Sequence, residues 1–165
     1  MKQTVRGMQI HVMACGHPLW DQTIAFAEKC AWKAGPYLAN ILRKNEFLAW
    51  ERVVAAVRDS RVIGFCTFTG KDELPEEHGY SPFIGFVFVE EGSRGQRISE
   101  KMISRASEYA KTLGYKAVYL MSGEKGLYEK YGFVKIGDFE TIWGTVDQLF
   151  QKELLPDRSP ASMQS

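Results

Sequence analysis

The chain has 165 residues, of which 45% are hydrophobic and 25% are charged, a composition typical of one soluble globular domain. Lysine and arginine number 21 and aspartate and glutamate number 20, so the formal net charge is only +1. This balance gives no overall attraction to nucleic acid or to an anionic membrane, and we expect neither as a partner. Ten phenylalanines, seven tyrosines and four tryptophans exclude a disordered chain.

The three cysteines, Cys15, Cys30 and Cys66, are odd in number and lack the spacing of a CxxC motif or a zinc finger. We therefore expect free thiols in a reducing cytosol, with Cys66 in the core rather than acting as a nucleophile. His11 and His17 lack the spacing of metal ligands, and we expect no metal site. The chain has no apolar run of about eighteen residues and no hydrophobic signal segment, which predicts a cytoplasmic protein.

The N-terminal part predicts one strand and two helices. Alternating apolar residues over 8–13 indicate the strand. The first helix is expected over 22–34, with Asp21 as its N-cap and Gly35-Pro36 at its end. A second helix is expected over 37–46.

From about residue 51 the pattern changes to strands. Residues 53–58 and 61–69, joined by the turn Asp59-Ser60, are typical of a hairpin. The segment 70–80 is polar and acidic and is expected to be a loop. The segment 83–89 is apolar on both faces, which favours a central strand covered on both sides.

The C-terminal half alternates strands and helices. Apolar residues at helical spacing predict a one-sided buried helix over 98–113. A strand over 116–121, a short helix over 124–131 and strands over 133–136 and 146–152 follow.

These elements predict a mixed α/β (α+β) fold with a single, mostly antiparallel central sheet flanked by helices. We assign the domain to residues 1–155. The composition of residues 156–165 predicts a disordered C-terminal tail.

The most informative segment is the loop 90–97, which joins an apolar strand directly to a helix. Such a turn points backbone N–H groups and the positive end of the helix dipole at one place, which suits a phosphate. Arg94 and Arg97 add positive charge, Ser99 adds a hydroxyl, and Gly95 lets the backbone approach a ligand closely. The segment is neither a Walker A motif nor a dinucleotide fingerprint. Taken alone, it is equally consistent with a simple turn whose arginines are solvated.

From Phe86 to Phe133 the sequence resembles the core of the GNAT superfamily of acyl-CoA N-acyltransferases. The family's pattern is an apolar strand, the motif Q/R-x-x-G-x-G/A, an amphipathic helix, a strand, and a short helix with a tyrosine before a Gly-Phe pair. Here the corresponding segments are Val87-Phe88-Val89, Arg94-Gly95-Gln96-Arg97-Ile98-Ser99, 116–121 and Leu127-Tyr128-Glu129-Lys130-Tyr131-Gly132-Phe133.

The resemblance implies a GNAT-like fold and acetyl-CoA as cosubstrate. In such enzymes the pantetheine arm pairs with strand backbone between two splayed parallel strands, and the turn amides bind the pyrophosphate. Gly92, Arg97 and Ser99 depart from residues that are usual in the family, so Arg97 must adopt a backbone conformation that a β-carbon tolerates. The residues expected to bind the cofactor are Val87, Phe88, Val89, Arg94, Gly95, Gln96, Arg97, Ile98 and Ser99.

The implied reaction is transfer of an acetyl group to a primary amine of a small molecule or a protein, with the oxyanion near the amide of Val87. Tyr128 matches the family's general acid, which protonates the departing sulfur of CoA. The alternative is that Tyr128 is a core aromatic residue beside Phe133, and this is the interpretation we favour for Tyr131.

The general base is not identified from the sequence. The candidates in the loop 70–80 are Glu73, Glu76, Glu77 and His78, although an ordinary solvated loop is the interpretation we favour for them. Their charge is compatible with a cationic amine acceptor.

Two other functions remain open at this stage: a catalytically silent acyl-CoA-binding module, and an interaction domain without a CoA site. The acceptor, the length of the acyl group, and dimerisation of two identical chains through the last strands are also left open.

Overall fold

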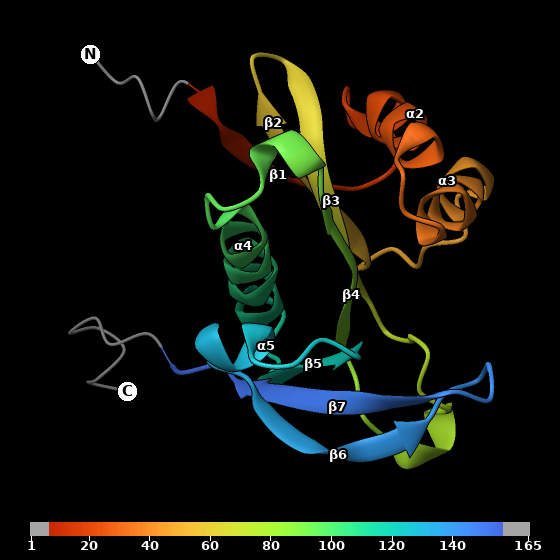
Figure 1. Cartoon of the computed structure of the whole chain (residues 1–165), viewed down its shortest axis with the longest axis vertical. Helices are drawn as coiled ribbons and strands as arrows, with labels where there is room; N and C mark the ends of the chain where they lie inside the picture. The colour runs from red at the N-terminus through yellow and green to blue at the C-terminus, as the bar shows by residue number, and fades with distance from the viewer. Residues whose placement is uncertain (1–6, 157–165) are drawn as a thin grey trace.

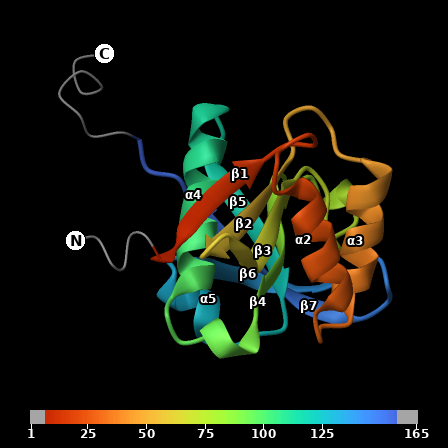
Figure 2. The same cartoon turned by 90° about the horizontal axis from the view of Figure 1, so that it is seen from above.

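One mixed sheet organises the part of the chain that the computed structural model describes, residues 7–156. Its seven strands lie in the order β1-β2-β3-β4-β5-β7-β6, with helices on both faces (Figures 1 and 2). The predicted fold class is thereby confirmed. The predicted tail, apart from Pro156, and the first six residues of the assigned domain lie outside the described residues.

The elements have the following bounds. The strands are β1 (Gln9–Met13), β2 (Arg52–Arg58), β3 (Arg61–Thr69), β4 (Phe83–Val89), β5 (Ala117–Ser122), β6 (Val134–Glu140) and β7 (Val146–Glu153). The helices are α2 (Trp20–Lys29), α3 (Ala34–Lys44), α4 (Ile98–Thr112) and α5 (Leu127–Lys130), with short 3₁₀ turns η1 (Glu76–His78) and η2 (Glu91–Ser93).

The strand pairing changes in the middle of the sheet. Strands β1 to β4 pair antiparallel in sequence order, and the predicted hairpin 53–69 is the pair β2–β3. Its turn residues Asp59 and Ser60 both have positive φ, 52° and 65°, as a tight two-residue hairpin requires. β4 and β5 are parallel, whereas β5, β7 and β6 pair antiparallel. The second half of the sheet is therefore attached to the first through β4 and β5.

The two faces of the sheet carry separate cores. Helix α4 packs Met102, Ile103 and Ala106 against one face, whereas α2 and α3 cover the other face (Figure 2). Trp20 and Leu38 are among the residues that those two helices bury. This three-layer arrangement holds β4 in the middle of the molecule, as the doubly apolar segment 83–89 predicts.

The predicted boundary between the first two helices is wrong. α2 begins at Trp20 with Leu19, not Asp21, at its N-cap, and it ends at Lys29 because Cys30 is extended. Gly35-Pro36 does not end a helix but lies in the first turn of α3, where the missing N–H of proline costs nothing. A β-carbon on Gly35 would stand 2.3 Å from the Ala27 carbonyl oxygen, so glycine permits the close packing of α2 on α3.

Smaller differences occur near the C-terminus. The short helix is limited to α5, and β6 continues to Glu140 rather than 136 because it pairs along β7. Among the described residues no helix combines the length and apolar character needed to cross a membrane.

Candidate active site

Strands β4 and β5 separate soon after they meet. Their one paired position is Phe83 with Tyr119, next to the bond from the Tyr119 N–H to the Pro82 carbonyl at 2.9 Å. Beyond this point the edge of β4 that faces β5 has no strand partner. Unpaired backbone groups of this kind can accept an added strand or an extended ligand.

A β-bulge shapes the same stretch of β4. Phe65 pairs with Phe88 and Thr67 with Gly85, so β4 carries one more residue than β3 in this interval. Phe86 has a φ of +49°, which is unusual for a residue with a β-carbon. Bulges re-aim the side chains and backbone groups beside them, and here the change occurs where the strands separate.

The backbone of Val87 and Val89 faces the gap between the two strands. The Glu90 N–H donates to the Ile63 carbonyl of β3 at 2.9 Å. Because backbone groups alternate in direction along a strand, those of Val89 and Val87 point the other way, toward β5. The carbonyl of Val89 accepts a bond from Nε of Arg94 at 2.9 Å.

Phe88 and Arg94 contact one another and other parts of the protein, and both also line the cleft described below. The backbone of Phe88 faces β3, and its ring lies in the core under α2 and α3. The guanidinium of Arg94 lies 5.6 Å from the centre of this ring. Arg94 therefore braces the end of β4 in the structure as it stands.

The loop after β4 ends in an amide-rich turn. Gly95 and Arg97 both have positive φ, 82° and 60°. With ψ at 29°, Arg97 lies in the left-handed region that residues with a β-carbon tolerate, which meets the requirement inferred from the sequence. The first N–H groups of α4, those of Ile98, Ser99 and Glu100, have no partner within the helix. A 15-residue helix with such a start is suited to bind an anion.

Side chains of this turn bond within the protein. Nε of Arg97 donates to Oε1 of Glu100 at 2.5 Å, and the Ser99 hydroxyl lies 2.8 Å from the Tyr131 hydroxyl. Oε1 of Gln96 accepts a bond from Arg58 at 2.7 Å. Any anion affinity of the turn therefore depends chiefly on its backbone amides.

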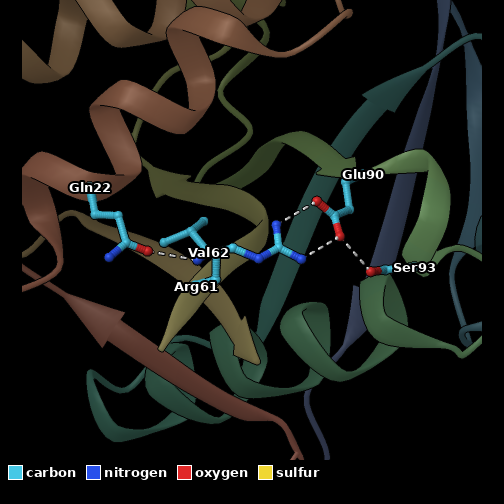
Figure 3. Close-up of polar contacts among 5 residues, drawn as sticks. All are labelled: Gln22, Arg61, Val62, Glu90 and Ser93. Atoms are coloured by element: carbon cyan, nitrogen blue, oxygen red, sulfur yellow. Dashed lines mark hydrogen bonds and ion pairs between the residues drawn. The ribbon is translucent and has the colours of Figure 1, made fainter. Parts of the chain in front are cut away.

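A polar network ties the start of the loop to the rest of the domain (Figure 3). The guanidinium of Arg61 donates to both carboxylate oxygens of Glu90, at 3.3 and 3.5 Å, and the Ser93 hydroxyl donates to one of them at 2.8 Å. Desolvation alone would raise the pKa of Glu90, but the bonds from Ser93 and Arg61 outweigh it and hold this pKa below its ordinary value. Gln22 of α2 accepts the Val62 N–H at 2.7 Å, which joins α2 to the same hairpin end.

Tyr128 is both a core residue and part of the cleft wall. Its side chain is only 5% exposed and packs with Tyr131, Phe133 and Phe150 at ring distances of 6.0, 6.2 and 5.8 Å. Burial raises the pKa of its hydroxyl to about 12, so the group keeps its proton at neutral pH. The two sequence interpretations of Tyr128 are thus compatible with one another.

A continuous cleft of about 1900 Å³ connects these features. At one end lies the turn before α4, and in the middle lie the bulged part of β4, the end of β5 and Tyr128. Toward the other end stand aromatic and acidic side chains from the α2–α3 connection, α3, the β3–β4 loop and the β6–β7 turn: Trp32, Tyr37, Asp72, Glu73 and Trp143.

Two carboxylates of the β3–β4 loop enter the cleft. A β-carbon built on Gly85 would stand 2.4 Å from Oδ1 of Asp72, so this carboxylate lies directly over β4. Burial raises the pKa of Asp72 to about 6. Burial, the charges of Asp72 and Asp147, and a hydrogen bond with Asp147 raise the pKa of Glu73 to about 7. Both groups can therefore exchange protons near neutral pH.

The other acidic candidates lie elsewhere. Glu76 and Glu77 are exposed in η1 outside the cleft, and His78 packs its ring 5.1 Å from that of Phe139. Sequence reasoning missed Asp72 as a candidate because four acids share this loop and nothing local marks which one turns inward. Glu51 also reaches the cleft, but its two oxygens accept the N–H groups of Leu48 and Gly70, each at 2.7 Å. That pairing commits Glu51 to a structural role.

Neither Cys66 nor a cluster of potential metal ligands supplies a further reactive group among the described residues. Burial raises the pKa of the Cys66 thiol to about 12, as expected for a core cysteine. In the described part of the chain no group of three His, Cys, Asp or Glu side chains could hold a metal ion.

Several solved structures with this fold are described as N-acetyltransferases. An aminoglycoside 6′-acetyltransferase type Ii is 18% identical, with a TM-score of 0.68 over 90% of this chain and 99% of its own. An aminoglycoside 6′-N-acetyltransferase in complex with coenzyme A is 16% identical, with a TM-score of 0.67 over 92% and 99%. A GNAT N-acetyltransferase from Escherichia coli in complex with CoA is 20% identical, with a TM-score of 0.65 over 90% and 82%. At these identities the likeness establishes the fold alone.

The sequence itself gives the family. Residues 16–133 match the acetyltransferase (GNAT) family, and the chain therefore belongs to it. It is accordingly an acetyl-CoA-dependent N-acetyltransferase, as the resemblance at the sequence level implies. A search of curated protein sequences finds no match.

Proposed function

We propose that the protein transfers the acetyl group of acetyl-CoA directly to the primary amine of a small cationic acceptor. The observation that carries this proposal is a continuous cleft, which joins an amide-rich turn and an unpaired stretch of β4 to inward-facing carboxylates. Donor and acceptor would meet at the bulge in β4.

The donor would lie along β4. The backbone of Val87 and Val89 would pair with the pantetheine arm, and the amides from Gly95 to Ser99 would bind the pyrophosphate. Two proteins of the same fold have been solved in complex with coenzyme A, which supports CoA as the ligand. The Val89 carbonyl would become available only if Arg94 released it, which leaves this guanidinium free to pair with a phosphate.

The acceptor amine must lose a proton to become a nucleophile, because an alkylamine has a pKa of about 10 and is mostly charged at neutral pH. Asp72 would accept this proton, directly or through one water molecule, since its carboxylate lies over Gly85 beside the bulge. Glu73, with its pKa raised to about 7, would hold or pass on the proton. The Val87 amide would donate to the oxyanion that forms when the amine attacks.

Tyr128 would act on the leaving group. Its hydroxyl keeps its proton at neutral pH and would donate a hydrogen bond, and finally that proton, to the sulfur of CoA. A thiol has a pKa of about 8.5, well below that of Tyr128, so stabilisation of the thiolate by the hydrogen bond would matter more than complete transfer.

Two measurements test the proposal together. Acetyl-CoA at about 100 times its dissociation constant should stabilise the fold by about 2.7 kcal/mol, which a thermal shift detects. Release of the CoA thiol in the presence of a panel of amines should then report turnover. Stabilisation without thiol release would favour the silent acyl-CoA-binding module, whereas the absence of both would contradict the donor site.

A further inference from the structure

The far end of the cleft has a rim of exposed apolar side chains. Tyr37 is 53% exposed, Ile142 56% and Trp143 60%, and all three line the cleft. The rings of Tyr37 and Trp143 meet edge to face at 6.2 Å, so α3 and the β6–β7 turn approach each other here. Large aromatic side chains left open to water at a cleft mouth are characteristic of binding sites.

The aromatic surface continues from the rim to the floor. Tyr37 stacks on Phe86 at 6.1 Å, and Trp32 contacts Phe86 at 6.1 Å and stacks on Phe88 at 5.7 Å. Phe86 is the residue of the bulge, where the reacting groups would meet. An aromatic wall therefore runs from the solvent to the proposed reaction centre.

Negative charge is concentrated at the inner end of this wall. Asp72 and Glu73 enter the cleft there, and the Ile142 N–H donates to the Glu73 carbonyl at 2.8 Å, which holds the rim turn against the acidic loop. Lys33 and Lys71 also line the cleft, and Lys71 pairs with the exposed Glu76 at 3.4 Å. The arrangement presents carboxylates at the reaction end and aromatic rings outside them.

We infer that the acceptor is a primary amine joined by a short linker to an aromatic or other flat apolar body; this inference rests on the proposed function. The ammonium group would be drawn to the carboxylates beside the bulge, and the flat body would lie against Trp32, Tyr37 and Trp143. Aromatic rings prefer offset stacked or edge-to-face partners, and this wall offers both kinds of contact.

The same surface is poorly suited to a polyhydroxylated polycation. Each buried hydroxyl or ammonium of such a ligand needs a hydrogen-bond partner to offset its loss of water. The five rings of the wall, those of Trp32, Tyr37, Phe86, Phe88 and Trp143, offer only the Tyr37 hydroxyl and two indole N–H groups as polar atoms, whereas the charged side chains of Lys33, Glu46 and Lys71 lie elsewhere in the cleft lining. This chain therefore differs in expected acceptor from the aminoglycoside acetyltransferases whose fold it shares.

The test is a comparison of acceptors by CoA release and by mass spectrometry of the products. The panel contains phenethylamine and tryptamine, the polyamine spermidine, the aminoglycoside kanamycin and a peptide with a free N-terminus. We expect kcat/KM for the two aromatic amines to exceed that for the other three by at least about tenfold, which corresponds to one or two aromatic contacts.

Two single substitutions test whether the acceptor binds at the rim of the cleft. Trp143→Ala and Tyr37→Ala should each raise KM for tryptamine by about three- to tenfold, with kcat and acetyl-CoA affinity nearly unchanged. Val134→Ala is the matched control, because Val134 is 68% exposed but lies outside the cleft lining. All three side chains are exposed, and thermal unfolding of each variant confirms that the fold is retained.

The outcomes separate this inference from the function on which it rests. Efficient acetylation of kanamycin, spermidine or the peptide in preference to the aromatic amines would overturn the acceptor assignment and leave the transferase intact. Unchanged KM in both rim variants would overturn it as well. If acetyl-CoA binds but no amine is acetylated, the proposed function itself fails.

Discussion

At the residue scale, the proposed proton acceptor is one carboxylate whose position no local pattern reveals. Asp72 lies over Gly85, where any side chain on residue 85 would collide with it. Its pKa of about 6 results from desolvation, which a backbone bond from Glu73 only partly offsets. A carboxylate held in this way destabilises the fold slightly and is at the same time a better base at neutral pH.

Asp72→Asn should lower kcat/KM at pH 7 by about 10²-fold if Asp72 accepts the amine proton. In the wild type, kcat/KM should rise with pH through a limb whose pKa lies between about 6 and 7. This limb should be weakened or lost in the variant. Glu77→Gln, an exposed change in the same loop, is the control, and equal losses in both variants would contradict the assignment.

We expect the same substitution to raise the stability of the fold although it lowers activity. The folded state binds the Asp72 proton more tightly than the unfolded chain, so stability falls as pH rises from the ordinary value of 3.8 to about 6. Above pH 6 the carboxylate is charged in both states, and the free energy of unfolding is lowered by the full cost of burying that charge. Asp72→Asn should therefore be more stable than the wild type by about 1–3 kcal/mol at pH 8 and equal to it near pH 3. Urea unfolding at the two pH values measures this, and a variant less stable at pH 8 would disprove it.

Tyr128→Phe should lower kcat by about 10²-fold and at most 10⁴-fold, while the affinity for acetyl-CoA stays the same. Because the pKa of Tyr128 is about 12, its ionisation should produce no alkaline limb below about pH 11. Tyr109→Phe is the control, since its hydroxyl bonds to the Trp50 carbonyl and neither residue is part of the cleft lining. Unchanged turnover in Tyr128→Phe would make Tyr128 a purely structural residue.

At the element scale, the sequence predicts well what depends on neighbouring residues. The segments 61–69, 83–89 and 98–113 each carry an apolar pattern along their full length, and all three elements occur within a residue of the predicted ends. The sequence pattern misassigns Gly35-Pro36, because it does not reveal that Gly35 packs on Ala27 of α2, eight residues earlier, from the first turn of α3. The inward turn of Asp72 likewise depends on how β3 and β4 align, which local patterns do not encode.

The turn before α4 likewise has features that neighbouring residues predict and features that depend on the rest of the fold. Its glycine and its position before a helix predict an anion site, and the resemblance adds the CoA assignment. The bracing of that turn from the β2–β3 hairpin is a long-range feature: Arg61 holds Glu90, and Arg58 holds Gln96. Nothing in the sequence distinguishes Arg58 and Arg61 from other residues at the ends of strands.

Glu90→Gln should weaken acetyl-CoA binding without changing kcat at saturating donor, because the substitution loosens the loop rather than the reacting groups. Arg61 is 66% exposed, so the ion pair is partly screened, and we expect a three- to tenfold rise in the dissociation constant, an order-of-magnitude figure of about 1 kcal/mol. Calorimetric titration measures it. Glu91→Gln is the control, because it removes the same charge at the neighbouring exposed position and should leave acetyl-CoA affinity unchanged. An equal loss of affinity in both variants would show that the charge matters, and not the contact of Glu90 with Arg61.

At the scale of the whole molecule, the sheet consists of two halves that meet at one paired position between β4 and β5. β1 to β4 form one antiparallel half, and β5, β7 and β6 form the other (Figure 1). The cleft lies where the halves separate, so a ligand that pairs with β4 and contacts β5 would bridge them. Donor binding should therefore stiffen the junction more than either half.

Amide hydrogen exchange tests this expectation directly. Added acetyl-CoA should slow exchange at Val87, at Val89 and over residues 95–99, because those amides would acquire hydrogen-bond partners. The amides of the β1–β2 pair already bond within the sheet and should change little, which makes them an internal control. Pantetheine, which lacks the pyrophosphate, should slow exchange of the β4 amides but not of the amides in the turn. Protection confined to the turn would mean that the arm does not pair with β4, and the proposed meeting point of donor and acceptor at the bulge would then be wrong.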